Sequence, residues 1–329
     1  MDPTERVPLG RTGLEVTRLG LGTAPLGGLY TEVAEEQALA VVEAAWASRL
    51  RFYDTAPLYG NGLAEQRLGR ALGPRPRAEF VLATKVGRLL RADAPPEPRQ
   101  AFRGAPPVNP RFDFSATGAR QSLAESLERL GLERVDILHI HDPDQHHDEA
   151  LTGAFRALAE LRSRGKIHGI GAGMNQAAML ARFAREADFD CFLLAGRYTL
   201  LDQSGLAELL PLCAARRIAV ICGGVFNSGI LADPLADPRY NYAPAPPEIV
   251  ERALQLQAVC DRHGVPLPAA AIQFPLGHPA VASVVVGARS AAELDQDLRM
   301  FRWPIPPALW AELRQQGLIA AEAPAPPAP

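Results

Sequence analysis

The chain has 329 residues, of which 47% are hydrophobic and 22% are charged, a composition typical of a globular protein. Its formal net charge is −3, which argues against a nucleic-acid-binding protein because such proteins usually carry a basic excess. The sequence contains no run of about 18 apolar residues, so we expect no membrane span. No apolar run follows residues 1–6, so we expect no secretory signal either.

Short apolar runs alternate with amphipathic segments along the whole chain. Each run is too short for a helix and is rich in Val, Ile, Leu or Phe, so it predicts a buried strand. The eight runs are Thr17–Leu21, Arg51–Tyr53, Phe80–Thr84, Val135–Ile140, His168–Gly171, Cys191–Leu194, Ile218–Cys222 and Ser283–Val286. Segments with helical periodicity between them include Glu35–Ala47, Ala119–Leu130, Asp148–Ser163, Ala177–Arg185, Pro247–Asp261 and Ala291–Leu298. Eight strands that alternate with helices predict an α/β fold, a parallel sheet closed into a (β/α)₈ TIM barrel, with a doubly wound sheet as the alternative.

Three further segments flank or interrupt this pattern. Val7–Val16 predicts a β-hairpin ahead of the first strand, at the bottom of the barrel. Arg88–Ser115 is rich in proline and lacks periodicity, and a loop of this length is usually functional or disordered. We expect residues 1–322 to form a single barrel domain with a C-terminal extension, followed by a disordered Ala/Pro tail at 323–329.

The four cysteines lie scattered through apolar segments. This placement predicts buried thiols rather than a disulfide framework or a zinc site, and it favours a reducing, cytoplasmic compartment. The residues are Cys191, Cys213, Cys222 and Cys260.

Polar residues follow three neighbouring predicted strands, where the active site of a barrel is found. Asp54 and Tyr59 follow the second strand, Lys85 the third, and His141 the fourth. This combination suits proton transfer to a carbonyl oxygen, because an ammonium group favours the phenolate, a carboxylate orients the ammonium, and a histidine can donate to the oxygen. Taken singly, the residues also fit a buried Lys85–Asp54 ion pair and a packed loop aromatic at Tyr59.

Two other motifs have a ligand-binding interpretation. His139–Glu149 contains four histidines, which fits either a metal site or one catalytic histidine, one core histidine and a solvated loop; we predict no metal. Gly287-Ala-Arg-Ser290 precedes a predicted helix, whose N-terminus and Arg289 can receive a phosphate. The alternative is an exposed helix cap.

These motifs resemble the aldo-keto reductase superfamily, from Leu9-Gly-Arg-Thr-Gly13 to about Arg302. The family is a (β/α)₈ barrel that binds NAD(P)(H) at its mouth, and its catalytic tetrad corresponds here to Asp54, Tyr59, Lys85 and His141. Several blocks are most similar to the aldose 1-dehydrogenase branch, which includes L-fucose, D-threo-aldose and pyridoxal 4-dehydrogenases. They include Val86-Gly-Arg-Leu-Leu90, Phe112-Asp-Phe-Ser115 and Gly171-Ala-Gly-Met-Asn-Gln176.

The resemblance implies a cofactor site of NAD or NADP. Where the family has a Ser-Asn pair after the fifth strand, this chain has Gly173-Met174, so we assign Asn175 instead, and Phe226 replaces an aromatic expected near Gly223. The resemblance assigns cofactor binding to Gly22, Thr23, Asp54, Gly173, Asn175, Gly223, Phe226, Gly229, Leu231, Gly287, Arg289, Ser290, Glu293, Gln296 and Asp297. Glu293 disfavours the 2′-phosphate of NADP whereas Arg289 favours it, and we favour NAD.

The function implied is oxidation of an aldose, such as L-fucose or a D-threo-aldose, at C1 to the lactone. Tyr59 would act as the general acid and base, and the substrate would also contact His141, Arg197, Tyr198 and Asn227. The alternatives are an NADPH-dependent carbonyl reductase, a pyridoxal 4-dehydrogenase and a non-enzymatic cofactor-binding subunit. We expect a small-molecule sugar or aldehyde as the partner, no nucleic acid or membrane, and a monomer or homodimer.

Overall fold

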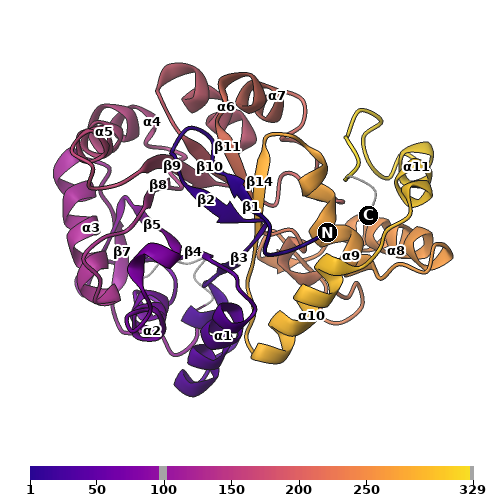
Figure 1. The fold of residues 1–329 in the computed structure, drawn as a ribbon, viewed down its shortest axis with the longest axis horizontal. Helices are drawn as coiled ribbons and strands as arrows, with labels where there is room; N and C mark the ends of the chain where they lie inside the picture. The colour runs from indigo at the N-terminus through magenta and orange to yellow at the C-terminus, as the bar shows by residue number, and fades with distance from the viewer. Residues whose placement is uncertain (96–101, 327–329) are drawn as a thin grey trace.

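The computed structural model describes residues 1–95 and 102–326, and its centre is a closed barrel of eight parallel strands (Figure 1). The strands follow one another around the barrel in the order β10-β11-β14-β3-β4-β5-β8-β9. The predicted (β/α)₈ barrel is therefore confirmed, and the doubly wound alternative is wrong. The barrel strands are β3 (Leu19–Gly22), β4 (Phe52–Asp54), β5 (Val81–Val86), β8 (Ile137–His141), β9 (Gly169–Met174), β10 (Cys191–Ala195), β11 (Ala219–Gly223) and β14 (Val281–Val286).

Helices surround the barrel on the outside, as Figure 1 shows. In α1 the residues Ala38, Val41, Val42 and Ala45 are buried, at the spacing that places them on one helical face toward the strands. The helices are α1 (Glu35–Ala47), α2 (Leu63–Leu72), α3 (Ala116–Leu130), α4 (His147–Glu149), α5 (Arg156–Ser163), α6 (Ala177–Glu186), α7 (Leu209–Arg216), α8 (Pro247–Arg262), α9 (Leu267–Gln273), α10 (Ala291–Arg302) and α11 (Pro307–Gln315). A π-helical stretch, Ala150–Phe155, joins α4 to α5.

The predicted N-terminal hairpin closes one end of the barrel. Strands β1 (Arg6–Pro8) and β2 (Glu15–Thr17) pair antiparallel and lie across the middle of the barrel in Figure 1. The side chains of Val7, Leu9 and Val16 join a buried cluster with the inward-facing residues of the barrel strands. The hairpin thus covers this end of the barrel, opposite the carboxyl end of the strands.

Two short hairpins rise at the carboxyl end of the barrel. Strands β6 (Arg88–Arg91) and β7 (Asn109–Phe112) pair antiparallel within the segment expected to be an aperiodic loop, and its residues 96–101 lie outside the described part of the chain. The prolines of this segment hide the strand pattern, because proline breaks the ladder signal. The second hairpin consists of β12 (Arg239–Tyr240) and β13 (Ala243–Pro244).

The end of the described chain packs against the body of the protein. The Arg314 guanidinium donates two hydrogen bonds to the carbonyl of Ala323, at 3.0 and 2.7 Å, and Ala323 is buried. Gly277 has no side chain, and a Cβ there would lie 2.3 Å from the Pro324 carbonyl oxygen. The structure thus differs from the expected disorder at residues 323–326, because Arg314 and Gly277 give them a docking place. Residues 327–329 of the expected tail lie outside the described residues.

All four cysteines are free and buried. Burial raises the pKa of the Cys213 and Cys260 thiols to about 12, and it raises the pKa of Cys191 and Cys222 further. Along the described chain, no helix has both the length and the apolar character needed to cross a bilayer.

Candidate active site

A cavity of about 1050 Å³ opens at the carboxyl end of the barrel strands. Its volume falls near the upper end of the range for ligand pockets. Its floor includes Tyr59, Lys85 and His141, which come from three neighbouring strand ends. Other residues of its lining are Arg88, Phe102, Phe112, Asp142, Gly173, Asn175, Arg197, Asn241 and Tyr242. Three of the four predicted tetrad residues therefore meet at one place.

Lys85 and Asp54 form a buried ion pair beneath the cavity. The Lys85 ammonium donates to Asp54 Oδ2 at 2.7 Å and to the carbonyl of Thr55 at 2.9 Å. Burial raises the pKa of the Asp54 carboxyl, while the charge of Lys85 acts in the opposite direction. These contacts fix the ammonium 4.6 Å from the centroid of the Tyr59 ring. The ion-pair interpretation and the catalytic interpretation thus describe the same contact.

Tyr59 is carried by a tight loop after β4. Gly60 adopts a left-handed backbone with φ of 61°, and a Cβ there would lie 2.3 Å from the carbonyl oxygen of Gly27. Only glycine permits this approach, which sets the position of the neighbouring tyrosine. The Tyr59 ring meets the His141 ring edge-on, with 6.0 Å between their centroids.

The Tyr59 phenol is neutral in this site. Burial is the largest cause that raises its pKa well above that of free tyrosine, followed by the charges of Asp54 and Asp142. The structure differs here from the expectation that Lys85 lowers this pKa. Because Asp54 offsets the ammonium charge, burial decides the direction. Tyr59 is therefore ready to donate a proton and needs a further influence to accept one.

The two histidines of β8 have different environments. His141 lines the cavity, and burial, followed by the charges of Arg88 and Lys85, lowers its pKa well below that of free histidine. His139 is fully buried below it, and burial lowers its pKa to about 3. A Cβ at Gly171 would lie 2.2 Å from His139 Nδ1, so glycine makes room for this ring. His141 is thus a neutral donor at the cavity floor, and His139 is a core residue.

Sequence reasoning missed an ion pair at the cavity wall. The buried Arg88 donates to Asp142 Oδ2 at 2.7 Å, and Asp142 Oδ2 lies 3.5 Å from His141 Nε2. Both residues follow strands that carry tetrad residues, so their place after Lys85 and His141 was the available signal. Tyr242 also lines the cavity, from the tip of the β12–β13 hairpin.

The residues expected to bind substrate divide into two groups. Arg197 lines the cavity and donates to Asn241 Oδ1 at 2.9 Å. The expectation that Tyr198 lines the cavity is wrong. Its ring is buried and packs against Phe274, with 5.1 Å between the two ring centroids. Asn227 is buried outside the cavity lining, and its amide donates to the Gly196 carbonyl at 3.4 Å. The loops that follow β10 and β11 turn these two side chains away from the mouth.

The residues expected to bind the cofactor lie on strand ends and loops beside the mouth. Gly173 and Asn175 line the cavity, and the Thr23 hydroxyl donates to the Asp54 carbonyl at 3.1 Å. Gly287 packs closely, since a Cβ there would lie 2.6 Å from Pro25 Cγ. Gly22, Gly223 and Gly229 lie at strand or turn ends, whereas the Phe226 side chain is half-buried against the core and Leu231 is fully buried. Their role in cofactor binding stays a prediction.

The first turn of α10 holds an ionic cluster. Ser290 caps the helix, since its hydroxyl accepts from the Glu293 amide at 3.2 Å. The Glu293 carboxylate accepts from the Arg289 amide at 2.7 Å and from the Arg289 guanidinium at 2.8 Å. Burial, followed by the charge of Glu293, raises the pKa of Asp297 to about 7. The side chain of Gln296 is exposed. A positive helix end with an arginine suits a phosphate of a nicotinamide dinucleotide, so the residues present fit such a cofactor.

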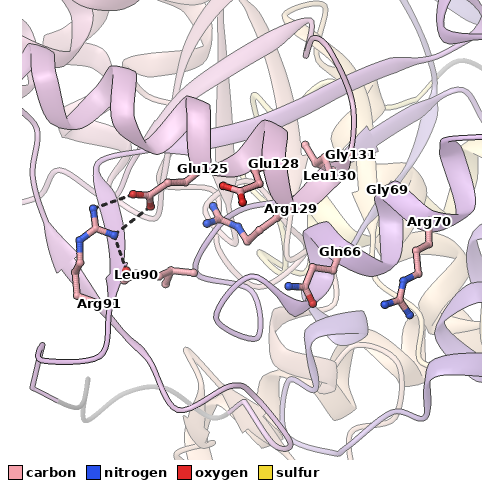
Figure 2. A pocket seen from close by; sticks show the side chains of 10 residues that line it. All are labelled: Gln66, Gly69, Arg70, Leu90, Arg91, Glu125, Glu128, Arg129, Leu130 and Gly131. Carbon is pink, nitrogen blue, oxygen red and sulfur yellow. Dashed lines mark hydrogen bonds and ion pairs between the residues drawn. The ribbon is translucent and has the colours of Figure 1, made fainter.

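A second hollow lies outside the barrel, between α2, α3 and β6 (Figure 2). Its volume is about 710 Å³. Figure 2 shows that Arg91 and Glu125 pair with one another across it, with an Arg91 Nη2–Glu125 Oε1 distance of 2.9 Å. Arg129 beside them bonds to the buried Glu65 at 2.6 Å. These charged side chains are paired within the protein. The candidate catalytic residues are those at the barrel mouth.

Comparison with known proteins identifies the family. A model of the Aldo/keto reductase family matches residues 18–316. The chain belongs to this family. It is an oxidoreductase of the kind that uses a nicotinamide cofactor.

Several curated relatives of this aldo/keto reductase cover nearly its whole length. It is 46% identical to D-threo-aldose 1-dehydrogenase of Pseudomonas sp, over 93% of this chain and 96% of the relative. It is 45% identical to pyridoxal 4-dehydrogenase of Microbacterium luteolum, over 96% of this chain and 98% of the relative. L-galactose dehydrogenase of Arabidopsis thaliana is 32% identical over 91% of this chain and 88% of the relative.

Solved structures support the fold of this aldo/keto reductase. A glycerol dehydrogenase from Gluconobacter oxydans superposes with a TM-score of 0.74 at 19% identity, covering 99% of this chain and 98% of that chain. An aldo-keto reductase from Bacillus halodurans gives a TM-score of 0.74 at 23% identity, covering 97% and 98%. At this identity the similarity concerns the barrel alone.

Proposed function

We propose that this aldo/keto reductase oxidises an aldose, with L-fucose as the representative sugar, at C1 to the lactone with NAD(P)⁺. The observation that carries the proposal is that Tyr59, Lys85 and His141 form the floor of a cavity whose walls carry polar side chains among apolar ones. Arg88, Asp142, Asn175 and Arg197 offer hydrogen bonds that suit the hydroxyls of a sugar better than an apolar aldehyde. The 46% identity to a D-threo-aldose 1-dehydrogenase supports the same substrate class.

Tyr59, in its phenolate form after its own proton has passed to solvent, takes the proton of the C1 hydroxyl, and the C1–H bond breaks as the C1–O double bond forms. When bound, an oxidised nicotinamide would supply the hydride acceptor that this oxidation requires. Lys85, held by Asp54, stabilises the phenolate form of Tyr59 once the proton has left. Neutral His141 donates a hydrogen bond to the reacting oxygen and fixes its position.

For the cofactor we favour NAD⁺ over NADP⁺, because Glu293 already pairs with Arg289 at the start of α10. A carboxylate there repels a 2′-phosphate and can accept from a ribose hydroxyl. We expect Glu293→Gln to strengthen NADP⁺ binding about tenfold relative to NAD⁺, as one lost repulsive contact predicts. Fluorescence titration of both cofactors measures this without turnover. Asp295→Asn, two residues further along α10 and exposed, is the control, and an unchanged ratio in Glu293→Gln would contradict the assignment.

Pyridoxal oxidation is the second candidate. The chain is 45% identical to a pyridoxal 4-dehydrogenase, and the rings of Phe102 and Phe112 line the cavity beside the polar groups. An aromatic substrate can stack on such rings. Reduction of simple aldehydes with NADPH uses the same tetrad in the opposite direction and is the third outcome to test.

The deciding experiment incubates purified protein with NAD⁺ or NADP⁺ and a panel of substrates while the absorbance of reduced nicotinamide is followed. The panel contains L-fucose, D-arabinose, L-galactose and pyridoxal. Reduction with the sugars supports the proposal and identifies the cofactor. Reduction with pyridoxal alone favours the second candidate, and NADPH consumption with simple aldehydes but no signal with sugars overturns the proposal in favour of a carbonyl reductase.

A further inference from the structure

We propose that Asp142, held in place by Arg88, determines substrate specificity by accepting a hydrogen bond from the hydroxyl on the carbon next to the reacting carbon. The inference rests on the proposed aldose oxidation and deepens it, since it assigns which hydroxyl of the sugar the cavity recognises. It concerns the cavity wall beside His141, not the tetrad itself.

Arg88 is built to hold a carboxylate. The residue is buried, and its guanidinium lies 4.8 Å from the centroid of the Phe112 ring. It donates to Asp142 Oδ2 at 2.7 Å. A buried guanidinium costs several kcal/mol in desolvation unless it is paired, so this contact holds the Asp142 carboxyl against Arg88. Proton transfer by Tyr59 does not require such a pair.

The backbone of Asp142 is held in an unusual conformation. Its φ is +44°, in the left-handed region that residues other than glycine seldom adopt. The Asp142 amide donates to the carbonyl of Gly173 at 3.0 Å, which secures this conformation against β9. Such local strain, of order 1 kcal/mol, recurs at ligand-binding sites. Here it turns the carboxylate back toward the cavity, where the side chain is 26% exposed.

The distance to His141 specifies which hydroxyl the carboxylate can reach. Asp142 Oδ2 lies 3.5 Å from His141 Nε2, the donor that faces the reacting oxygen in the proposed reaction. Oxygens on neighbouring carbons of a sugar lie about one hydrogen-bond length apart. A sugar whose C1 oxygen bonds to His141 therefore brings its C2 oxygen within reach of Asp142. An ionised carboxylate offers about four lone-pair sites, so it can hold Arg88 and a substrate hydroxyl at once.

The test compares L-fucose with 2-deoxy-L-fucose, two sugars that differ only in the C2 hydroxyl. In the wild-type protein we expect kcat/KM for L-fucose to exceed that for the 2-deoxy sugar by about 10- to 100-fold, the usual worth of a hydrogen bond to a charged group. Asp142→Asn should reduce this ratio about tenfold. Asp148→Asn, the same change at a carboxylate that is 93% exposed, should leave the ratio unchanged.

Arg88→Gln provides a second variant that keeps the carboxylate but removes its anchor, and it should also reduce the ratio. Thermal melting establishes that each variant is folded, and if Asp142→Asn is not, Arg88→Gln decides. A wild-type ratio near one, or an equal loss on both sugars in the variants, overturns the role of Asp142 while aldose oxidation stands. A wild-type protein that oxidises neither sugar overturns the proposed function itself.

Discussion

Burial and the charges near Tyr59 favour a phenol that stays protonated until cofactor and substrate bind. The carboxylates of Asp54 and Asp142 raise its pKa, and Arg88 opposes them. Oxidation needs the phenolate and reduction needs the phenol, so we expect oxidation to quicken, and reduction to slow, as the pH rises toward the pKa of Tyr59. The position of the loop after β4 therefore affects the direction of the reaction as well as its rate.

Tyr59→Phe removes the hydroxyl and keeps the ring that packs edge-on against His141. We expect a loss of turnover of about 10²- to 10⁴-fold, the usual contribution of a general acid or base. Cofactor binding should change by less than about threefold, because the binding groups assigned above lie on other loops. Steady-state kinetics and cofactor fluorescence titration measure the two effects. A parallel collapse of cofactor affinity would contradict the proton-transfer role.

Asp297 should make the stability of the protein depend on pH. Its pKa in the folded protein is raised to about 7, above the value of about 4 in the unfolded chain. The folded state then binds the proton more tightly, so stability falls as the pH rises from about 4 to 7. Asp297→Asn should therefore stabilise the protein at pH 8 by on the order of 1 kcal/mol and have little effect near pH 4. Chemical denaturation at both pH values measures this.

The matched control for that substitution is Asp295→Asn. The Asp295 side chain is 62% exposed and pairs with Arg299 on the helix surface, so its loss should cost less than about 0.5 kcal/mol at either pH. An Asp297→Asn protein that is less stable than the wild type at pH 8 would show that its carboxylate is ionised and favourably bound.

The sequence predicted the lining of the cavity best where a polar residue stands at the end of a barrel strand. Lys85 and His141 belong to strands whose ends are fixed by the barrel, so their convergence follows from the strand order. Tyr198 and Asn227 belong to loops, where one turn of backbone decides whether a side chain faces the mouth or the core. The pairing of Arg88 with Asp142 was not expected, because a single sequence does not reveal that two distant charges pair.

At the scale of elements, Glu65 joins α2, β5 and α3. Its carboxylate is fully buried, and it accepts from the Thr84 hydroxyl at 2.7 Å and from Arg129 Nε at 2.6 Å. Thr84 precedes Lys85 in β5, and α2 follows the loop that carries Tyr59. The Glu65 carboxylate thus fixes α2, which follows the loop that carries Tyr59, relative to β5, which carries Lys85.

Glu65→Ala leaves Arg129 without its buried partner, and we expect it to lower the free energy of unfolding by about 3–5 kcal/mol. Glu125→Ala, in the same outer hollow, breaks a partly exposed pair and should lower it by less than about 1 kcal/mol. Urea denaturation of the two variants provides the comparison. Equal losses would mean that the Glu65 contacts contribute no more than a surface pair.

The elements themselves were largely predictable. α1 begins and ends at the residues expected from its periodicity, and each of the eight expected strands overlaps a barrel strand. The β6–β7 hairpin was not expected, because its strands contain few β-branched residues and one contains Pro110. Short strands of this kind pair because the barrel end beneath them holds their bases together, which local sequence does not encode.

At the scale of the whole molecule, the C-terminal segment connects parts that are distant in sequence. The Arg252 guanidinium donates to the carbonyl of Leu318 at 2.7 Å, and Arg314 holds Ala323. Pro324 then lies against Gly277 in the turn before β14. Low complexity alone predicted disorder for this segment, since an Ala/Pro composition gives no sign of the groove that receives it.

Deletion of residues 323–329 should therefore destabilise the protein. It removes the acceptor of two Arg314 hydrogen bonds and exposes the surface beneath Ala323. We expect a loss of about 1–2 kcal/mol, which corresponds to a fall in Tm of a few degrees. Calorimetry of the full chain and the shortened chain measures it. An unchanged Tm would show that the segment contributes nothing to the fold.

The reactivity of the four buried thiols can report how the barrel opens. Thiolate is the reactive form, and burial suppresses it at Cys191, Cys213, Cys222 and Cys260 alike. Because Cys191 and Cys222 belong to the barrel wall whereas Cys213 and Cys260 lie in outer helices, a thiol reagent can modify each group only when that layer separates. The order in which the four cysteines become labelled would show whether the outer helices separate from the barrel before the sheet opens. No labelling site has to be introduced into the protein for this measurement.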